Sequence, residues 1–123
     1  MKPSFSDDVA RSIDRILPRH EFEARIRIRL ERDRQKLSLQ GWARDLSESG
    51  LGAFVAESLK PGELVTLEIP LPDSAKQIIP AKVVRTLGTQ YGFQFTALSA
   101  EQRLRIRETL EGHPVLPHYA DEP

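Results

Sequence analysis

Hydrophobic and polar residues alternate along six short stretches of the chain, and this alternation predicts β-strands. The clearest stretch is residues 24–30, where Ala24, Ile26, Ile28 and Leu30 would face a core while the arginines between them face outward. The other stretches are residues 37–43, 51–55, 64–69, 78–87 and 91–95. Short strands separated by regularly spaced turns are typical of antiparallel barrels and sandwiches, so we expect an all-β fold.

A short helix is expected near each end of the sequence. Ser6 can cap the first helix, which Pro18 ends because a proline disfavours helical backbone in the residue before it. The apolar stripe of this helix consists of Val9, Ile13, Ile16 and Leu17. Ser99 and Gln102 form a capping box for the second helix, which runs to Leu110.

Composition narrows the class of protein. The 123 residues suit one domain, and the chain contains no cysteine, which excludes a disulfide scaffold, a zinc–thiolate site and a cysteine nucleophile. No stretch is long and apolar enough to span a membrane, and neither end matches a targeting signal. We therefore expect a cytoplasmic protein that does not act at a membrane.

The net charge is zero, but the charges are unevenly distributed. Residues 11–36 carry nine basic and five acidic groups, whereas residues 37–80 carry three basic and six acidic groups. A net charge of zero argues against a protein that binds long polyanions such as DNA or RNA. It permits a small anionic ligand, because such a ligand needs only two or three well-placed cations.

Two motifs flank the first pair of expected strands. The first is Arg15-Ile-Leu-Pro-Arg19, and the second is Asp45-Leu-Ser47-Glu-Ser-Gly50. Each is weak alone, but their order and interval on an all-β pattern resemble the PilZ domain family, in which RxxxR precedes [D/N]xSxxG by some 20 to 30 residues. The resemblance covers about residues 14–110, including the alternating run at residues 91–95 and the closing helix.

The resemblance implies a six-stranded antiparallel PilZ-type β-barrel with a short N-terminal helix and a C-terminal helix. We accordingly expect an N-terminal helical segment (residues 1–14), a PilZ barrel domain with its closing helix (residues 15–111) and a loose C-terminal tail (residues 112–123). It also implies binding of the bacterial second messenger cyclic di-GMP and signalling to a downstream protein partner. Ligand binding would then reorder the N-terminal segment.

The ligand-binding residues implied by the resemblance are Arg15, Arg19, Asp45, Ser47 and Gly50, and their chemistry suits this ligand. Arginine pairs with phosphate and with the O6/N7 edge of guanine, and its plane stacks on purines. Asp45 would accept hydrogen bonds from guanine N1 and N2. Ser47 would reach a phosphate or a neighbouring backbone group, and Gly50 would permit a tight turn or a close approach to the ligand.

Each of these residues also has a structural interpretation. Arg15 can be a surface residue of the first helix, and Asp45 with Ser47 can form a turn that holds the hairpin. Trp42 is expected in the core rather than as a stacking platform. Arg44 is a further candidate ligand contact. The outward arginines Arg25, Arg27 and Arg29 form either a solvated face or a partner surface.

Several other activities are disfavoured. No nucleophile with its base, catalytic carboxylate pair or phosphate-binding glycine loop is recognisable, so we expect no enzyme and no cofactor. His20, His113 and His118 lack metal-ligand spacing, so we expect no metal site. Asp14, directly before Arg15, would disfavour a stacked pair of dianionic ligands. The remaining alternatives are a PilZ-like adaptor without a ligand and a small barrel that binds single-stranded nucleic acid.

Overall fold

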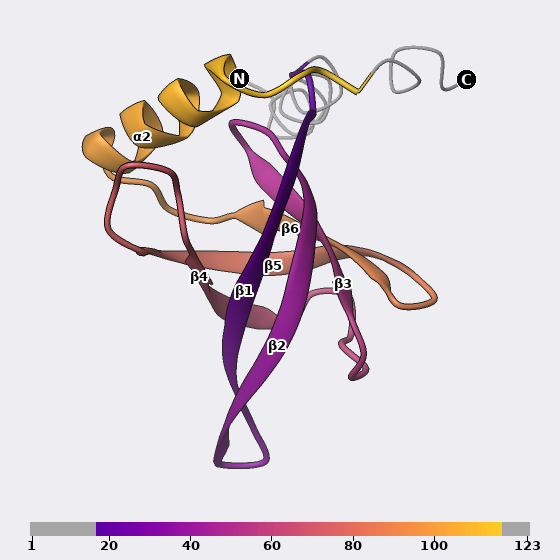
Figure 1. Cartoon of the computed structure of the whole chain (residues 1–123). Helices are drawn as coiled ribbons and strands as arrows, with labels where there is room; N and C mark the ends of the chain where they lie inside the picture. The colour runs from indigo at the N-terminus through magenta and orange to yellow at the C-terminus, as the bar shows by residue number, and fades with distance from the viewer. Residues whose placement is uncertain (1–16, 117–123) are drawn as a thin grey trace, which may run out of the picture.

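The computed structural model describes residues 17–116, which form a closed antiparallel barrel followed by one helix (Figure 1). The strands are β1 (His20–Arg32), β2 (Gln35–Leu46), β3 (Gly50–Val55), β4 (Leu64–Ile69), β5 (Gln77–Leu87) and β6 (Gln90–Phe95), and the helix is α2 (Ala100–Glu111). Around the barrel the strands follow the order β1-β2-β3-β6-β5-β4. All six expected strands and the expected C-terminal helix are confirmed, whereas the expected N-terminal helix lies outside the described residues.

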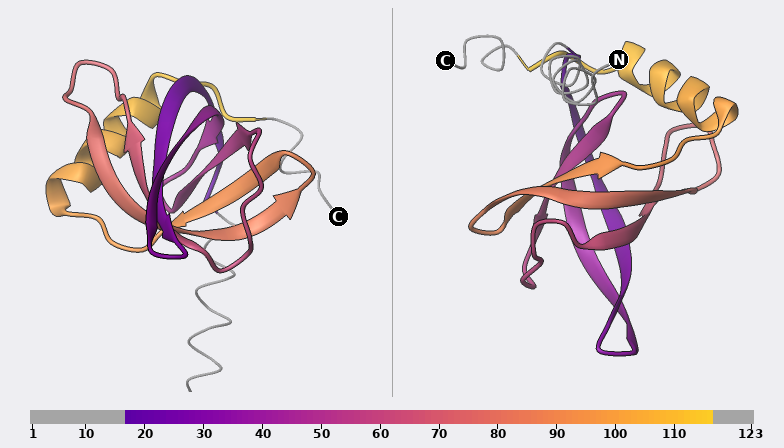
Figure 2. Two further views of the ribbon diagram at one scale, coloured as in Figure 1. Left: turned by 90° about the horizontal axis from the view of Figure 1, so that it is seen from below. Right: turned by 180° about the vertical axis from the view of Figure 1, so that it is seen from behind.

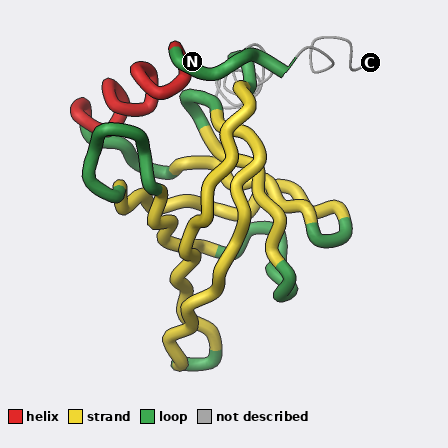
Figure 3. Tube along the Cα trace, viewed as in Figure 1, coloured by secondary structure: helices red, strands yellow, loops and turns green. Residues whose placement is uncertain are grey.

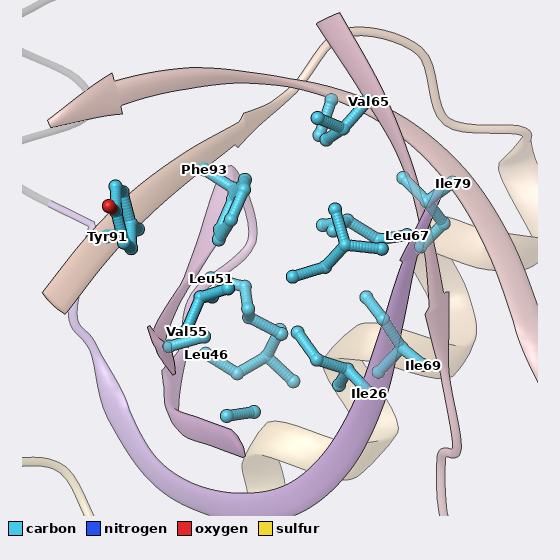
Figure 4. Packing of buried hydrophobic residues seen from close by; sticks show 14 of the residues in the cluster. Ile26, Leu46, Leu51, Val55, Val65, Leu67, Ile69, Ile79, Tyr91 and Phe93 are labelled. Atoms are coloured by element: carbon cyan, nitrogen blue, oxygen red, sulfur yellow. The ribbon is translucent and has the colours of Figure 1, made fainter. Parts of the chain in front are cut away.

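The core lies inside the barrel and is built from the alternating apolar positions of all six strands (Figure 4). Ile28, Leu46, Leu51 and Val83 are fully buried there. One face of α2 adds Ile106 to the same core, so the helix closes one end of the barrel (Figure 2). Every described buried side-chain nitrogen or oxygen has a hydrogen-bond partner, as a stable interior requires.

Trp42 is not a core residue, contrary to the expectation. It lies on the outer face of β2 and is 39% exposed. The reason is the period of two: because Leu37 and Leu39 pack against the core, Gly41 and Ala43 must also point inward, and Trp42 between them points outward. Phe54 of β3 is its cross-strand partner and is similarly exposed.

The C-terminal tail is also not loose where the structure describes it. After Gly112 ends α2, the chain runs antiparallel to the start of β1 through a bridge between His20 and Val115. The Glu21 amide donates to the Pro114 carbonyl at 2.8 Å, and the Leu116 amide donates to the Arg19 carbonyl at 2.9 Å. This first part of the tail is ordered because its backbone groups find partners at the open edge of β1, and residues 117–123 lie outside the described residues.

Strands β1 and β2 are longer than expected and form a hairpin that projects beyond the rest of the barrel (Figure 3). Its two-residue turn is Asp33-Arg34, with φ angles of 53° and 65°. Such a turn favours glycine at its second position because other side chains are strained at positive φ. Arg32 secures the hairpin by donating to both carboxylate oxygens of Glu63, at 2.9 and 3.0 Å.

No helix among residues 17–116 is long and apolar enough to cross a membrane.

The positive φ angle of Arg34 can be tested by substitution. Arg34→Gly should raise the free energy of unfolding by about 0.5–1 kcal/mol, because relief at positive φ exceeds the entropy that glycine adds to the unfolded chain. Urea denaturation measures the change, and Arg34→Ala is the matched control because it removes the same side chain but keeps the backbone strain. Equal stabilisation by both variants would contradict this explanation.

Candidate functional site

The structure brings together the second arginine of the first motif and the aspartate of the second motif. Arg19 donates from Nη1 to Oδ1 of Asp45 at 2.8 Å, and both side chains are about one-fifth exposed, at 22% and 21%. The register of β1 and β2 causes this proximity, because His20 pairs with Leu46 and Glu21 pairs with Asp45. Two residues that are 26 positions apart in the sequence therefore form one ion pair at the surface.

Ser47 holds the turn between β2 and β3. Its hydroxyl accepts hydrogen bonds from the amides of Ser49 and Gly50, each at 3.2 Å, and its own amide donates to the Gly50 carbonyl at 2.9 Å. The residue is only 3% exposed. In this structure the Ser47 hydroxyl therefore stabilises its own turn, which is the turn-forming role considered from the sequence.

Gly50 is required by packing. A Cβ atom at this position would lie 2.2 Å from the carbonyl oxygen of Phe93, which is far inside the contact distance. Gly50, the first residue of β3, pairs with Gln94 of β6, so its missing side chain lets β3 and β6 approach each other. The same glycine thus ends the motif and permits the barrel to close.

A strip of outer surface to which β3 and β6 contribute only glycines extends from Asp45 across these two strands. In the sheet register Asp45 pairs with Gly52, Gly52 with Gly92, and Gly92 with Arg85. A Cβ at position 52 would lie 2.7 Å from Oδ2 of Asp45, so the carboxylate rests directly on this glycine. We call Gly52 and Gly92 the glycine floor, which has an anion at one end and a cation at the other.

An aromatic pair forms the neighbouring row on this face. Trp42 of β2 pairs with Phe54 of β3, and Phe54 pairs with Gln90 of β6. Both aromatic residues are about 40% exposed. The glycine floor is therefore bordered by flat apolar surface as well as by charge, which is the combination that a planar, charged ligand needs.

Sequence reasoning missed Gly52, Gly92, Arg85 and the exposed Phe54. The only signal was that Gly50 and Gly52 occupy outward positions of an alternating strand. That signal could not reveal the floor, because the adjacency of β3 and β6 is a long-range feature of the topology.

The remaining candidates are placed as follows. Arg15 lies outside the described residues. Arg44 is exposed at the bulge between Ala43 and Asp45, next to the motif aspartate. The outward arginines of β1 are exposed as expected. Arg25 pairs with Trp42, in the row of the aromatic pair, whereas Arg27 and Arg29 lie where β1 pairs with β4, away from the glycine floor.

Two histidines that are distant in sequence meet in the fold. His20 donates from Nδ1 to the carbonyl of His113 at 2.8 Å, and the His113 ring packs edge-on against Phe22 with centroids 5.7 Å apart. These contacts tie the segment after α2 to β1. Within residues 17–116, no group of three or more His, Cys, Asp or Glu side chains is arranged to hold a metal ion.

The described residues thus form a small closed barrel that carries an arginine–aspartate pair on its surface. The family model described as PilZ domain matches residues 11–112, and the chain belongs to the PilZ domain family. A comparison with curated proteins finds no matching sequence.

Solved structures share this fold. The PilZ domain of CeSA from a cellulose-synthesizing bacterium is 20% identical with a TM-score of 0.59, and the match covers 76% of this chain and 95% of that one. The PilZ domain of YcgR from Escherichia coli, determined with c-di-GMP, is 13% identical with a TM-score of 0.62, over 79% and 88% of the two chains. The Bacillus subtilis inhibitor of motility, MotI/DgrA, is 15% identical with a TM-score of 0.66, over 79% and 49%.

The packing role of Gly50 is testable without any ligand. Gly50→Ala should lower the free energy of unfolding by about 3 kcal/mol or more, because its methyl group would collide with the Phe93 carbonyl. Gly112→Ala is the matched control, since its Cβ would lie 3.7 Å from the nearest atom outside its chain neighbours, and it should change stability by less than about 0.5 kcal/mol. Similar urea midpoints for the two variants would contradict the packing role.

Proposed function

We propose that this domain is a cytoplasmic receptor, without enzymatic activity, that binds one cyclic di-GMP molecule on the outer face of β3 and β6. The observation that carries the proposal is the Arg19–Asp45 pair at the edge of the glycine floor. It joins the two halves of the family motif at one place on the surface. The similar YcgR domain, whose structure was determined with c-di-GMP, supports the choice of ligand.

In this proposal the two arginines hold the phosphates and the guanine edges. Arg15 and Arg19 would each supply a guanidinium, which pairs in a bidentate manner with phosphate or with guanine O6 and N7. Asp45 would keep Arg19 oriented and would use its further acceptor capacity for guanine N1 and N2. A guanine base would lie on the glycine floor beside the Asp45 carboxylate, which already rests against Gly52.

Ser47 and Gly50 would act on the ligand through the turn that they build. Ser47 satisfies two backbone amides and Gly50 permits β3 to reach β6, so together they fix the direction of the Asp45 carboxylate relative to the floor. Their contribution is preorganisation, because a site that is already shaped pays less entropy on binding.

Capture of the ligand would carry a signal to both ends of the described chain. Arg15 and Arg19 precede β1, so their attachment to a ligand would reposition the segment before the barrel relative to it. The Arg19 carbonyl also accepts from the Leu116 amide, so the same movement would strain the pairing of the segment after α2. A downstream protein would read either change.

A PilZ-like adaptor that binds no ligand is the alternative. The observation that favours it is that the motif side chains have partners within the protein: Arg19 pairs with Asp45, and Ser47 accepts hydrogen bonds from its own turn. A ligand titration separates the two functions, because the adaptor would fold and bind a protein with no response to cyclic di-GMP.

Isothermal calorimetry with cyclic di-GMP tests the proposal. The wild-type chain should bind one ligand per protomer, and Arg19→Ala or Arg15→Ala should weaken binding about 30- to 150-fold through loss of a charge-assisted contact. Arg103→Ala, an exposed arginine on α2, is the matched control and should bind like the wild type. No binding of the wild-type protein at about 50 μM ligand would favour the adaptor instead.

Gly52→Ala tests the glycine floor separately from the arginines. The added methyl group would displace the Asp45 carboxylate and cover the floor, so cyclic di-GMP affinity should fall by about tenfold or more. Stability should change by less than about 1 kcal/mol, since the disturbed ion pair is partly exposed. Calorimetry and urea denaturation measure the two effects, and unchanged affinity would show that the ligand does not use the floor.

A further inference from the structure

A second surface lies on the side of the barrel opposite the glycine floor. In the ring order β1-β2-β3-β6-β5-β4, β1 and β4 are neighbours and face away from β3 and β6. An open groove of about 640 Å³ runs between the β1–β2 hairpin and β4, and reaches β5. Its residues play no part in the proposed ligand site.

The groove exists because β1 and β4 separate. Their ladder covers only Arg27–Arg29 of β1, paired with residues 66–68 of β4. Beyond Arg29, β1 continues with β2 into the projecting hairpin, while β4 begins at Leu64 (Figure 1). Arg32 donates to Glu63 across this opening and so links the hairpin to the residue that precedes β4.

The lining of the groove is largely apolar. Leu30 and Leu37 contribute from the hairpin, Leu64 and Val65 from β4, and Pro80 from β5. Leu64 is 69% exposed although it lies in a strand. Exposed leucine beside a concave apolar surface is typical of a protein contact, whereas an isolated exposed leucine is unremarkable.

One wall of the groove carries a surplus of positive charge. Glu68, whose side chain is only 8% exposed, contacts Arg29 at 2.6 Å, Arg27 at 3.6 Å and Lys76 at 3.7 Å. One carboxylate cannot neutralise three cations. The other charged residues that line the groove are Glu31 and Lys36, whose charges offset each other. Arg27 and Arg29 remain 46% and 61% exposed and line the groove. Glu68 therefore holds two arginines in place at the groove without cancelling their charge.

We propose that this groove binds an acidic, leucine-containing segment of a partner protein. The cationic wall selects carboxylates, and the apolar lining accepts a leucine side chain from the same segment. The groove is too open to surround a small molecule, which normally buries most of its surface in its site. A polypeptide laid along the groove can combine several shallow contacts over a longer path.

The two surfaces can be occupied at the same time, because they lie on opposite sides of the ring. Partner binding at the groove therefore does not depend on the proposed ligand site, and cyclic di-GMP should not compete with it. This arrangement suits a domain that stays attached to its partner while its other face senses a ligand.

The test is an NMR titration of the full chain with capped synthetic octapeptides. The probe contains four glutamates and two leucines, and its counterparts contain lysines in place of the glutamates or alanines in place of the leucines. The glutamate–leucine peptide should shift amide resonances at residues 64–66 and 29–31, with a dissociation constant of about 1 mM or below. The lysine peptide should cause no such shifts, and the alanine peptide should bind about tenfold more weakly.

A pair of matched variants locates the contact. Leu64→Glu should weaken binding of the glutamate–leucine peptide about tenfold or more, because it removes an apolar contact and adds a repelling charge. Leu87→Glu alters another exposed leucine, 76% exposed and outside the groove, and should bind like the wild type. Both variants change surface residues, and their dispersed spectra would show that they fold.

Four outcomes would overturn the proposal. The first is an absence of groove shifts at about 2 mM peptide, and the second is equal binding of the lysine peptide. The third is equal loss of affinity in Leu64→Glu and Leu87→Glu. The fourth is a gain of binding only after removal of residues 1–16, which would assign the groove to the chain's own segment. Failure of cyclic di-GMP to bind would leave this proposal standing, since the peptide titration contains no nucleotide.

Discussion

The close approach of β3 and β6 is the constraint on which the rest of this structure depends. These strands are separated by β4 and β5 in sequence, and their pairing completes the ring that buries the core. At Gly50 the backbone of β3 passes so close to the Phe93 carbonyl that no side chain fits. The same approach lays Gly52 beside Gly92 and creates the flat outer surface next to Asp45. Barrel closure and the candidate site thus have one physical origin.

Local patterns were sufficient to predict the strands and the C-terminal helix. An alternating run such as residues 24–30 contains its own evidence, because side chains on one face of a strand must share an environment. Trp42 was assigned wrongly because it was judged by residue type. The alternation from Leu37 to Ala43 already required it to face outward. The alternation did not show how far β1 and β2 extend, because the turn that joins them, Asp33-Arg34, contains no glycine to mark it.

Features formed by distant segments could not be predicted. The motif predicted that Arg19 and Asp45 act together, but their ion pair depends on the register of β1 with β2. The glycine floor depends on which strands become neighbours, and the pairing of Val115 with His20 depends on the path of the chain after α2. The groove arises where β1 and β4 diverge, which is a property of strand length and ring order rather than of any sequence motif.

The pairing of the segment after α2 with the start of β1 has a consequence for engineering. It places the backbone of Arg19 within a hydrogen bond of Leu116, so the two limits of the described fold are spatial neighbours. A few residues would join them, and the chain would then be opened elsewhere, for example at the exposed turn around Gly88, where φ is 63° and no neighbouring atom is close. Such a circular permutant would keep every strand of the ring. It would also move the chain ends next to Gln90, in the same row as the aromatic pair, where an attached fluorophore would report directly on that face.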